Sequence, residues 1–204
     1  MNGNVLPEPK IGVIILAAGS SSRMNNEPKQ ALEFRGKTLL RRAAETALQG
    51  EFSSTIVVLG ANQKKSRKEI EDLPLQIAVN ENWLIGMSSS IKVGLLALSE
   101  ENLDAIIIML CDQPLVTTEI LQRLWDVYVE TGKPIAACEY ENTVGVPALF
   151  AREVFAELAD LQKDEGAKKI IKKDKYRVAL VTAPEAAFDI DTLQDFEELK
   201  RLNQ

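Results

Sequence analysis

The first apolar run of the chain leads directly into very small residues, and two cations follow them. Residues 11–16 are apolar, residues 17–19 read Ala-Ala-Gly, and Arg23 and Lys29 come next. Small residues let the backbone approach a ligand closely, and turning backbone amides form a concavity that binds anions. Arginine presents a fork to phosphate oxygens, and lysine presents a point charge. The pattern therefore predicts a loop that binds a triphosphate, with a glycine turn and solvated charges as the alternative.

Two other phosphate-binding patterns do not fit this loop. A dinucleotide-binding loop of the G-x-G-x-x-G type has a different spacing and no place for Arg23 and Lys29. A P-loop is excluded too, because no Gly-Lys-Ser or Gly-Lys-Thr follows the glycine at the spacing that this pattern requires. The small residues and the cations therefore indicate another kind of nucleotide site.

Carboxylates that could hold a metal ion stand in two other segments. Asp112 follows the apolar run 105–110, so it emerges where that strand ends. A hard cation such as Mg²⁺ commonly takes one or two carboxylates together with substrate phosphates. Asp189 and Asp191 stand two residues apart, so on an extended segment they point the same way. The alternatives are structural, because Asp112 could cap the following helix and Asp191 or Thr192 could cap the last one.

A transition from loop to helix follows at residues 82–95. The N-terminus of this predicted helix can receive an anion or the polar edge of a base. Ser88 or Ser89 could instead serve as the helix cap. Trp83 and Met87 are interpreted as core residues rather than ligand contacts, because large apolar side chains are mostly buried.

The composition restricts the chemistry that the chain can use. Histidine is absent, which excludes Ser–His–Asp and Cys–His catalysis and any metal site built on histidine. The net charge is −6 and no long basic stretch appears, so a duplex nucleic acid is not expected as a partner. The two cysteines, Cys111 and Cys138, indicate a reducing, cytoplasmic setting without a disulfide framework. Neither a membrane span nor a signal peptide is expected from the apolar runs.

The elements that would position these residues alternate along the chain. Apolar, β-branched runs predict strands buried on both faces, and amphipathic stretches predict helices that cover a mostly parallel sheet. We expect a single-domain α/β fold, a Rossmann-like three-layer sandwich, over residues 11–204, after a disordered segment at residues 1–10. Ligands of such folds bind beyond the carboxyl ends of the strands. The predicted strands are 11–16, 54–60, 75–80, 105–110, 134–138 and 176–181, and the predicted helices are 38–49, 62–73, 89–100, 117–130, 151–162 and 192–203.

Four motifs in order along the chain resemble those of a known family. They are the loop LAAGSSSRMNNEPKQAL, the stretch NENWLIGMSSSIKVGL, the turn MLCDQPLVT and the closing segment DIDTLQDFEEL. Together they are similar to the motifs of the molybdopterin nucleotidyltransferases, and the double alanine of the loop resembles the molybdenum cofactor cytidylyltransferases. The guanylyl branch of that family usually has Ala-Gly-Gly at this point.

The resemblance implies the nucleotide-diphospho-sugar transferase type of fold and a role for each matching residue. The implied catalytic residues are Arg23, Lys29 and Asp112. The implied Mg²⁺ ligands are Asp112 and Asp191, with Asp189 as the competing candidate. The implied nucleotide-binding residues are Leu16, Ala17, Ala18, Gly19, Ser22, Arg23, Lys29, Asn80, Gly86, Ser89 and Ser90. The implied acceptor-binding residues are Gln113, Gly145, Pro147, Asp164, Gly166 and Lys168, with Gly145 and Pro147 in a turn before a short strand.

The reaction that the resemblance implies is transfer of CMP from CTP to a phosphate-bearing acceptor, molybdopterin in this family, with release of pyrophosphate. A transient contact with a molybdoenzyme or its maturation factors is a further implication. The acceptor side departs from the family pattern, since Lys163 replaces a glycine, Lys168 an arginine and Val146 a histidine. The alternatives are a guanylyl- or sugar-phosphate-directed nucleotidyltransferase and a non-catalytic nucleotide-binding module.

Overall fold

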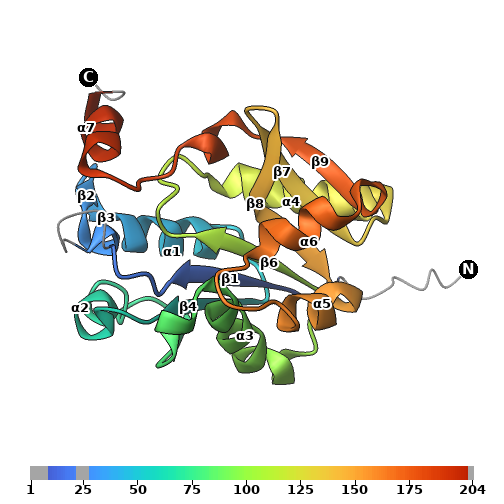
Figure 1. Cartoon of the computed structure of the whole chain (residues 1–204), viewed down its shortest axis with the longest axis horizontal. Coiled ribbons are helices and arrows are strands. Elements are labelled where there is room, and N and C mark those ends of the chain that lie inside the picture. Colours follow the sequence, from blue (N-terminus) through green and yellow to red (C-terminus); the bar gives the residue numbers. More distant parts are fainter. Residues whose placement is uncertain (1–8, 22–27, 202–204) are drawn as a thin grey trace, which may run out of the picture.

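A seven-stranded sheet forms the centre of the computed structural model, which describes residues 9–21 and 28–201 (Figure 1). The strands lie in the order β5-β4-β1-β6-β8-β7-β9. Their bounds are β1 Ile11–Ala17, β4 Ser54–Leu59, β5 Gln76–Val79, β6 Ala105–Leu110, β7 Ile135–Tyr140, β8 Thr143–Ala151 and β9 Val178–Thr182. A hairpin of β2 (Glu33–Phe34) and β3 (Lys37–Thr38) forms a separate two-stranded sheet.

The centre of the sheet is parallel because its strands are apolar on both faces. Every residue of β1 is buried, and β1 pairs in parallel with β4 on one side and β6 on the other. Alternate residues along these strands contribute to two apolar clusters, one on each face of the sheet. The carboxyl ends of β1, β4 and β6 therefore meet at one edge, where a ligand site is expected.

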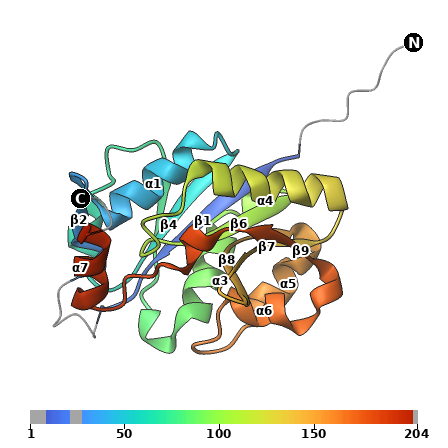
Figure 2. The ribbon, with the colours of Figure 1, turned by 90° about the horizontal axis from the view of Figure 1, so that it is seen from above.

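Helices cover both faces of this sheet and complete three layers (Figure 2). Helices α1 and α4 pack on one face, while α3, α5 and α6 pack on the other. The helices are α1 Leu39–Gln49, α2 Gln63–Lys68, α3 Met87–Ala97, α4 Thr118–Thr131, α5 Phe155–Ala159, α6 Ala167–Lys173 and α7 Leu193–Arg201. The predicted three-layer α/β fold with a mostly parallel sheet is confirmed. Over the described ranges, no helix is both long and apolar enough to cross a membrane.

The main departure from the predicted fold is at residues 141–151. Gly145 and Pro147 do not form a turn before a short strand; both lie inside β8, which pairs antiparallel with β6 and β7. The turn comes earlier, at Glu141 and Asn142, whose φ angles of 46° and 60° match a two-residue hairpin turn. The register of β7 against β8 shifts beside the proline, which has no N–H to donate.

Several predicted helices also have different bounds. The expected helix 62–73 is shorter, since α2 ends at Lys68, and the expected helix 151–162 is reduced to a 3₁₀ turn followed by α5. Helix α6 was not expected at all, because its seven residues are too few to show a clear amphipathic pattern. Helix α7 packs on the β2–β3 hairpin through a small apolar cluster of its own (Figure 1). This packing fixes the chain just before α7, where Asp189 and Asp191 stand.

Candidate active site

The loop after β1 forms one wall of a pocket of about 500 Å³ at the carboxyl edge of the sheet. The opposite wall comes from the stretch 83–87, which leads into α3, and Asp112 stands after the end of β6. The predicted nucleotide-binding residues that line this pocket are Leu16, Ala17, Ala18, Gly19, Lys29, Gly86 and Ser90. The fold therefore brings together motifs that lie far apart in the sequence.

Gln30 holds the loop in place, although the sequence analysis did not single it out. Its side chain is buried, and its Nε2 donates to the carbonyl oxygens of Ala17 at 3.2 Å and Gly19 at 2.8 Å. The Ser21 hydroxyl donates to Gln30 Oε1 at 3.4 Å and accepts from the backbone N–H of Lys29 at 2.9 Å. The buried side-chain amide of Gln30 thus holds the loop against the turn that contains Lys29.

These contacts turn the carbonyl oxygens of residues 17–19 toward the protein. Gln30 binds the first and the third, and the backbone N–H of Ala61 donates to the carbonyl oxygen of Ala18 at 3.0 Å. In a trans peptide the C=O and the following N–H point in opposite directions. The amides of residues 18–20 therefore point away from these partners, as an anion-binding loop requires.

Lys29 lies between two carboxylates that come from distant parts of the chain. Its Nζ forms an ion pair with Asp112 and lies 3.4 Å from Asp191 Oδ1. Burial on its own would lower the pKa of the Lys29 ammonium, but the attraction of Asp112 and Asp191 outweighs it and holds the pKa above its ordinary value. Lys29 is therefore charged at neutral pH and offsets the repulsion between the two carboxylates.

The segment before α7 brings Asp191 to this point. The Ile190 N–H donates to the backbone carbonyl of Asp112 at 2.9 Å, and Ile190 is buried in the apolar cluster under α7. Thr192 caps the helix, because its hydroxyl accepts from the Asp195 N–H at 3.2 Å. Asp195 Oδ2 in turn accepts from the N–H groups of Thr192 at 2.7 Å and Asp191 at 3.0 Å. Of the two residues that were predicted as alternative caps of this helix, Thr192 is the cap, and the carboxylate of the other, Asp191, faces Lys29.

Asp112 offers an oxygen atom that suits a divalent cation. Its Oδ2 contacts Lys29, but its Oδ1 is buried without a hydrogen-bond partner. Buried polar atoms normally have a partner, so an unpaired carboxylate oxygen indicates that a cation can bind there. The described residues contain no group of three or more carboxylate or thiol side chains that could hold a metal ion. Asp112 and Asp191 therefore fit a Mg²⁺ or Mn²⁺ whose remaining ligands come from phosphate and water.

Asp189 stands beside these carboxylates and lines a second pocket. The residue is exposed, yet the surrounding protein reduces the hydration of its carboxyl group. This desolvation, with repulsion from Asp112 and Asp191, raises the pKa of Asp189 to about 6. The pKa of Asp189 therefore depends on the charge of the other two carboxylates. That Asp189 binds the metal stays a prediction.

Asn80 fastens the start of α3 to the chain that follows β5. Its buried Nδ2 donates to the hydroxyls of Ser89 at 2.8 Å and Ser90 at 2.9 Å, and its Oδ1 accepts from the Asn82 N–H at 3.0 Å. The Ser89 hydroxyl also donates to the carbonyl of Gly86 at 2.7 Å. Of these three predicted nucleotide-binding residues Ser90 lines the pocket, while Asn80 and Ser89 hold its wall.

The stretch before α3 forms the rim of the pocket. Gly86 has a φ of 119°, and a Cβ there would lie 2.5 Å from both Asp164 Oδ1 and the Lys163 carbonyl, so this position requires glycine. The prediction that Trp83 and Met87 are core residues is wrong. Both line the pocket, and Met87 is 41% exposed. Trp83 lies in a short 3₁₀ turn and Met87 is the first residue of α3, so both side chains stand at the edge of the helical layer and face the pocket rather than the core.

The second pocket, of about 170 Å³, lies between the β7–β8 hairpin and the start of α6. The predicted acceptor-binding residues that line it are Gln113, Gly145, Gly166 and Lys168. Asp164 lines the larger pocket instead, and Pro147 is buried inside β8. The predicted acceptor residues are therefore divided between two pockets and the interior of a strand.

Two polar side chains shape this smaller pocket. Gln113 is buried, and its Nε2 donates to the carbonyls of Val146 at 3.2 Å and Ala186 at 2.8 Å, while its Oε1 has no hydrogen-bond partner. Tyr140 lies over Gly145, where a Cβ would come within 2.2 Å of the tyrosine hydroxyl. Burial raises the pKa of Tyr140 to about 12, so its hydroxyl is a neutral hydrogen-bond donor at physiological pH.

Two predicted site residues fall outside the part of the chain that the structure describes, and two residues of the site were not predicted from the sequence. Ser22 and Arg23, predicted for the nucleotide, fall outside the described residues. Gln30 and Tyr140 were missed by the sequence analysis. Gln30 follows Lys29 directly in the loop LAAGSSSRMNNEPKQAL, which we call the signature loop. That position was the one feature of the sequence that could have indicated its role. Tyr140 gave no signal, because the hairpin that places it was not predicted.

Comparisons with known sequences indicate the family to which the chain belongs. Residues 13–179 match the model of a family described as the MobA-like NTP transferase domain. Nicotine blue oxidoreductase of Paenarthrobacter nicotinovorans is 38% identical over 118 residues, which are 57% of this chain and 56% of that protein. The chain thus aligns with little more than half the length of that relative.

Solved structures share the fold over nearly the whole chain. Rv0371c of Mycobacterium tuberculosis has a TM-score of 0.81 at 31% identity, and the match covers 95% of this chain and 98% of that one. A structure of Rv0371c in complex with manganese has a TM-score of 0.77 at 31% identity, and covers 93% and 97%. A protein with this fold therefore binds a divalent metal.

Proposed function

The chain belongs to the MobA-like NTP transferase family, and we propose that it transfers CMP from CTP to a phosphate-bearing acceptor and releases pyrophosphate. One observation carries the proposal: Asp112 and Asp191 meet at Lys29, beside a pocket that the signature loop lines. Transfer of a nucleotidyl group needs a bound triphosphate, a cation at the phosphates and stabilisation of developing charge. This pocket offers groups for all three tasks.

The reaction we propose is an in-line displacement at the α-phosphorus of CTP. An acceptor phosphate oxygen forms a new P–O bond as the bond to the bridging oxygen breaks, and pyrophosphate leaves with that electron pair. A phosphate monoester loses its second proton near pH 6, so the attacking oxygen is already ionised at neutral pH. The absence of histidine from the chain is compatible with this chemistry, because no general base is needed.

The signature loop and the two cations would hold the triphosphate. The amides of residues 18–20 point away from the protein partners of the loop, so they can donate to phosphate oxygens. Arg23, predicted from the sequence, would add a fork to the same phosphates. The Lys29 ammonium group would exchange its contacts with the carboxylates for contacts with the leaving pyrophosphate, whose negative charge it would stabilise.

Asp112 and Asp191 would hold the divalent metal. Mg²⁺ is the ion that we propose, and Mn²⁺ has the same preference for oxygen ligands. When bound, such an ion polarises the α-phosphate and neutralises its charge. The unpaired Oδ1 of Asp112 is the observation that supports this assignment.

The two pockets would divide the substrates between them. We assign the cytosine to the end near Ser90, whose hydroxyl is fixed by Asn80. We assign the acceptor to the smaller pocket, with Lys168 for its phosphate and Tyr140 and Gln113 as polar partners. Molybdopterin is the acceptor that we propose, as in the family that the motifs resemble.

Release of pyrophosphate from each nucleoside triphosphate, with Mg²⁺ and with or without molybdopterin, tests the proposal. We expect acceptor-dependent release that is fastest with CTP and lost in Asp112→Asn. Faster release from GTP would indicate a guanylyltransferase, and release with a sugar 1-phosphate in place of molybdopterin would indicate another acceptor. Binding of a nucleotide without turnover on any of these acceptors would identify a non-catalytic module.

The name of the P. nicotinovorans relative raises a second candidate, an oxidoreductase activity. The amides of the loop could hold the pyrophosphate of a dinucleotide, although the G-x-G-x-x-G spacing is absent. Oxidation of NADH or NADPH in the presence of an electron-accepting dye tests this candidate. A rate well above the protein-free blank that Asp112→Asn leaves unchanged would favour it over nucleotidyl transfer.

A further inference from the structure

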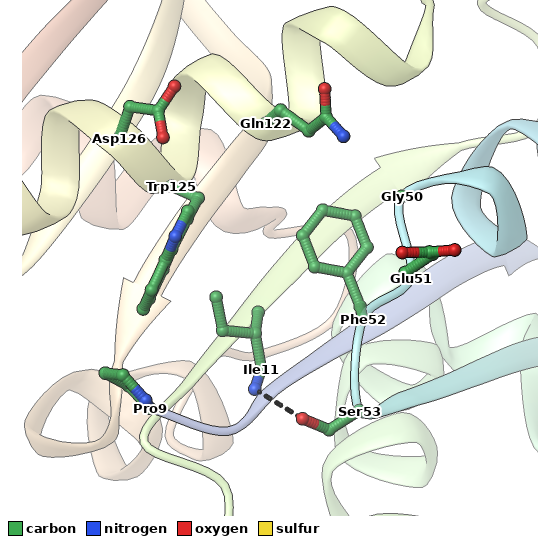
Figure 3. Close-up of a pocket in the computed structure, with 9 residues that line it drawn as sticks. All are labelled: Pro9, Ile11, Gly50, Glu51, Phe52, Ser53, Gln122, Trp125 and Asp126. Atoms are coloured by element: carbon green, nitrogen blue, oxygen red, sulfur yellow. Dashed lines mark hydrogen bonds between the residues drawn. The ribbon is translucent and has the colours of Figure 1, made fainter. Parts of the chain in front are cut away.

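Another large hollow lies at the opposite edge of the sheet from the candidate active site, and Figure 3 shows the residues that line it. Its volume is about 630 Å³, and it is bordered by the start of β1, the chain between α1 and β4, and helix α4. Strand β1 runs from Ile11 at this hollow to Ala17 at the nucleotide pocket. At about 3.3 Å per residue its length separates the two sites by roughly 20 Å.

Aromatic side chains form the walls of this hollow. Figure 3 shows the rings of Phe52 and Trp125 on either side of Ile11. Trp125 also packs against Tyr128, with ring centroids 5.7 Å apart. The Phe52 ring lies against Gly50, where a Cβ would come within 2.2 Å of a ring atom, so any larger residue there would displace the ring. The Ile11 N–H donates to Ser53 Oγ at 3.2 Å and fixes the floor.

The charged groups of the hollow all have the same sign. Glu51 and Asp126 line it, together with the neutral Gln122, and none of its lining residues is a lysine or an arginine. Glu51 has a φ of 54°, the left-handed position that usually falls to glycine after a helix. Here the glycine comes one residue earlier, under Phe52, and the glutamate occupies the left-handed position beside the hollow.

We propose that this hollow binds a small organic cation with an alkyl or flat body, such as an alkylguanidinium. The face of Trp125 can receive the cation through its ring quadrupole, and the apolar body can lie against Phe52 and Ile11. Glu51 and Asp126 supply the complementary charge. A cavity of several hundred cubic ångströms with apolar walls and a few polar groups has the usual character of a small-molecule site. Because the same carboxylates repel anions, binding of CTP and the acceptor is disfavoured there.

Butylguanidinium and butylurea are matched probes for this site, because they have nearly the same shape and differ in charge. In the full-length Trp83→Phe variant, Trp125 is the remaining tryptophan, so its fluorescence reports on the hollow. We expect a saturable change with butylguanidinium and binding of butylurea that is weaker by about tenfold or more. Equal binding of the two probes, or no saturable response to butylguanidinium, would overturn the proposal.

Two variants of the acidic groups locate the binding. Glu51→Gln combined with Asp126→Asn should weaken butylguanidinium binding by about tenfold or more, since both carboxylates are lost. Glu130→Gln changes the charge of the same helix outside the lining of the hollow and should leave binding unchanged. Equal weakening by both variants would show general attraction to an acidic protein and would contradict the proposed site. Unchanged CTP binding in the double variant verifies its fold, and if that variant does not fold the probe pair decides.

Discussion

Two buried glutamines mark the two halves of the candidate active site, and their polar atoms are satisfied to different degrees. On the nucleotide side Gln30 uses both ends of its amide, donating to two loop carbonyls and accepting from Ser21. On the acceptor side Gln113 donates to Val146 and Ala186, but its buried Oε1 has no partner. The loop of the nucleotide half is therefore held in shape without a ligand, whereas the acceptor half holds an amide oxygen that a bound donor would satisfy.

The two halves also differ in what builds their walls. One wall of the nucleotide pocket takes its shape from backbone at the carboxyl end of the parallel strand β1, whereas the acceptor pocket is lined largely by side chains, among them those of the antiparallel β7–β8 hairpin and α6. A backbone wall tolerates many substitutions, but a wall of side chains changes with each one. We infer that phosphate binding is the constant part of this site and that the choice of acceptor is the adjustable part.

Asp112 is a proposed metal ligand and also pairs with Lys29, so its removal has the largest expected effect. Asp112→Asn replaces a charged ligand with a neutral amide that binds Mg²⁺ poorly, and we expect the rate of pyrophosphate release to fall by about a hundredfold or more. The fold should be preserved, because the residue lies at the edge of the sheet and outside the apolar clusters. Circular dichroism and turnover at limiting Mg²⁺ measure the two effects, with Asp160→Asn as a surface control. Near-normal turnover would reassign Asp112 as a structural residue.

Lys29→Ala should separate transition-state stabilisation from ground-state binding on the nucleotide side. Loss of a charge-assisted contact costs about 1.5–3 kcal/mol, so we expect kcat to fall by one to two decades with a modest change in KM for CTP. Arg23→Ala should show the opposite balance and raise KM more than it lowers kcat. Steady-state kinetics of the two variants decide this, and an effect of Lys29→Ala on KM alone would contradict the division of roles.

The same lysine variant makes a second measurement possible. Lys29 Nζ contacts both Asp112 and Asp191, so it competes with a divalent cation for the two carboxylates. Without CTP, Lys29→Ala should therefore bind Mn²⁺ more tightly than the wild-type protein in a calorimetric titration. Mn²⁺ binding that the variant leaves unchanged would show that the metal site lies elsewhere, and weaker binding would contradict the competition.

The nucleotide half could be predicted from the sequence largely because its groups stand at strand ends. Parallel strands deliver their carboxyl ends to one edge, so the loop after β1 and Asp112 after β6 had to lie near each other. The gathering of Lys29 with Asp191 needed the family pattern as well, because α7 packs on the β2–β3 hairpin rather than on the sheet.

The acceptor half was harder to predict for a physical reason. The hairpin turn at Glu141 and Asn142 lacks the Asn-Gly pair that usually marks such turns, so β8 and the position of Tyr140 were missed. Gln30 was missed because its partners are backbone carbonyls that only the folded loop brings within reach. The side chains that complete a site are thus less visible in sequence than the strand ends that place it.

The two glutamines provide a matched pair of substitutions for testing the comparison between the halves. Gln30→Met removes the hydrogen bonds that shape the loop and should raise KM for CTP by about tenfold, with the acceptor KM unchanged. Gln113→Met should raise the acceptor KM by a similar factor and leave KM for CTP unchanged. Both variants leave backbone carbonyls without a donor, so thermal unfolding serves as the common measure of stability. A change in both KM values in either variant would show that the two halves are coupled.

The smallest expected effect concerns Asp189, which lines the acceptor pocket but responds to the carboxylates of the nucleotide side. Its pKa is about 6 in the folded protein and 3.8 ordinarily. Between these values the folded state binds more protons than the unfolded chain, so the free energy of unfolding falls as pH rises through this window. Because the residue is exposed and screened, the loss should not exceed about 1 kcal/mol.

Chemical unfolding of the wild-type protein and Asp189→Asn across this pH window measures that effect. The variant should gain stability relative to the wild type as pH rises from about 4 to about 7, because it has no carboxylate to ionise. Mn²⁺ should reduce the gain, since a cation held by Asp112 and Asp191 offsets their repulsion of Asp189. A gain that is independent of pH would mean that the carboxylate does not sense its neighbours. A gain that depends on pH but does not respond to Mn²⁺ would place the metal away from Asp112 and Asp191. The metal of the nucleotide half would then have no electrostatic effect on Asp189 in the acceptor pocket.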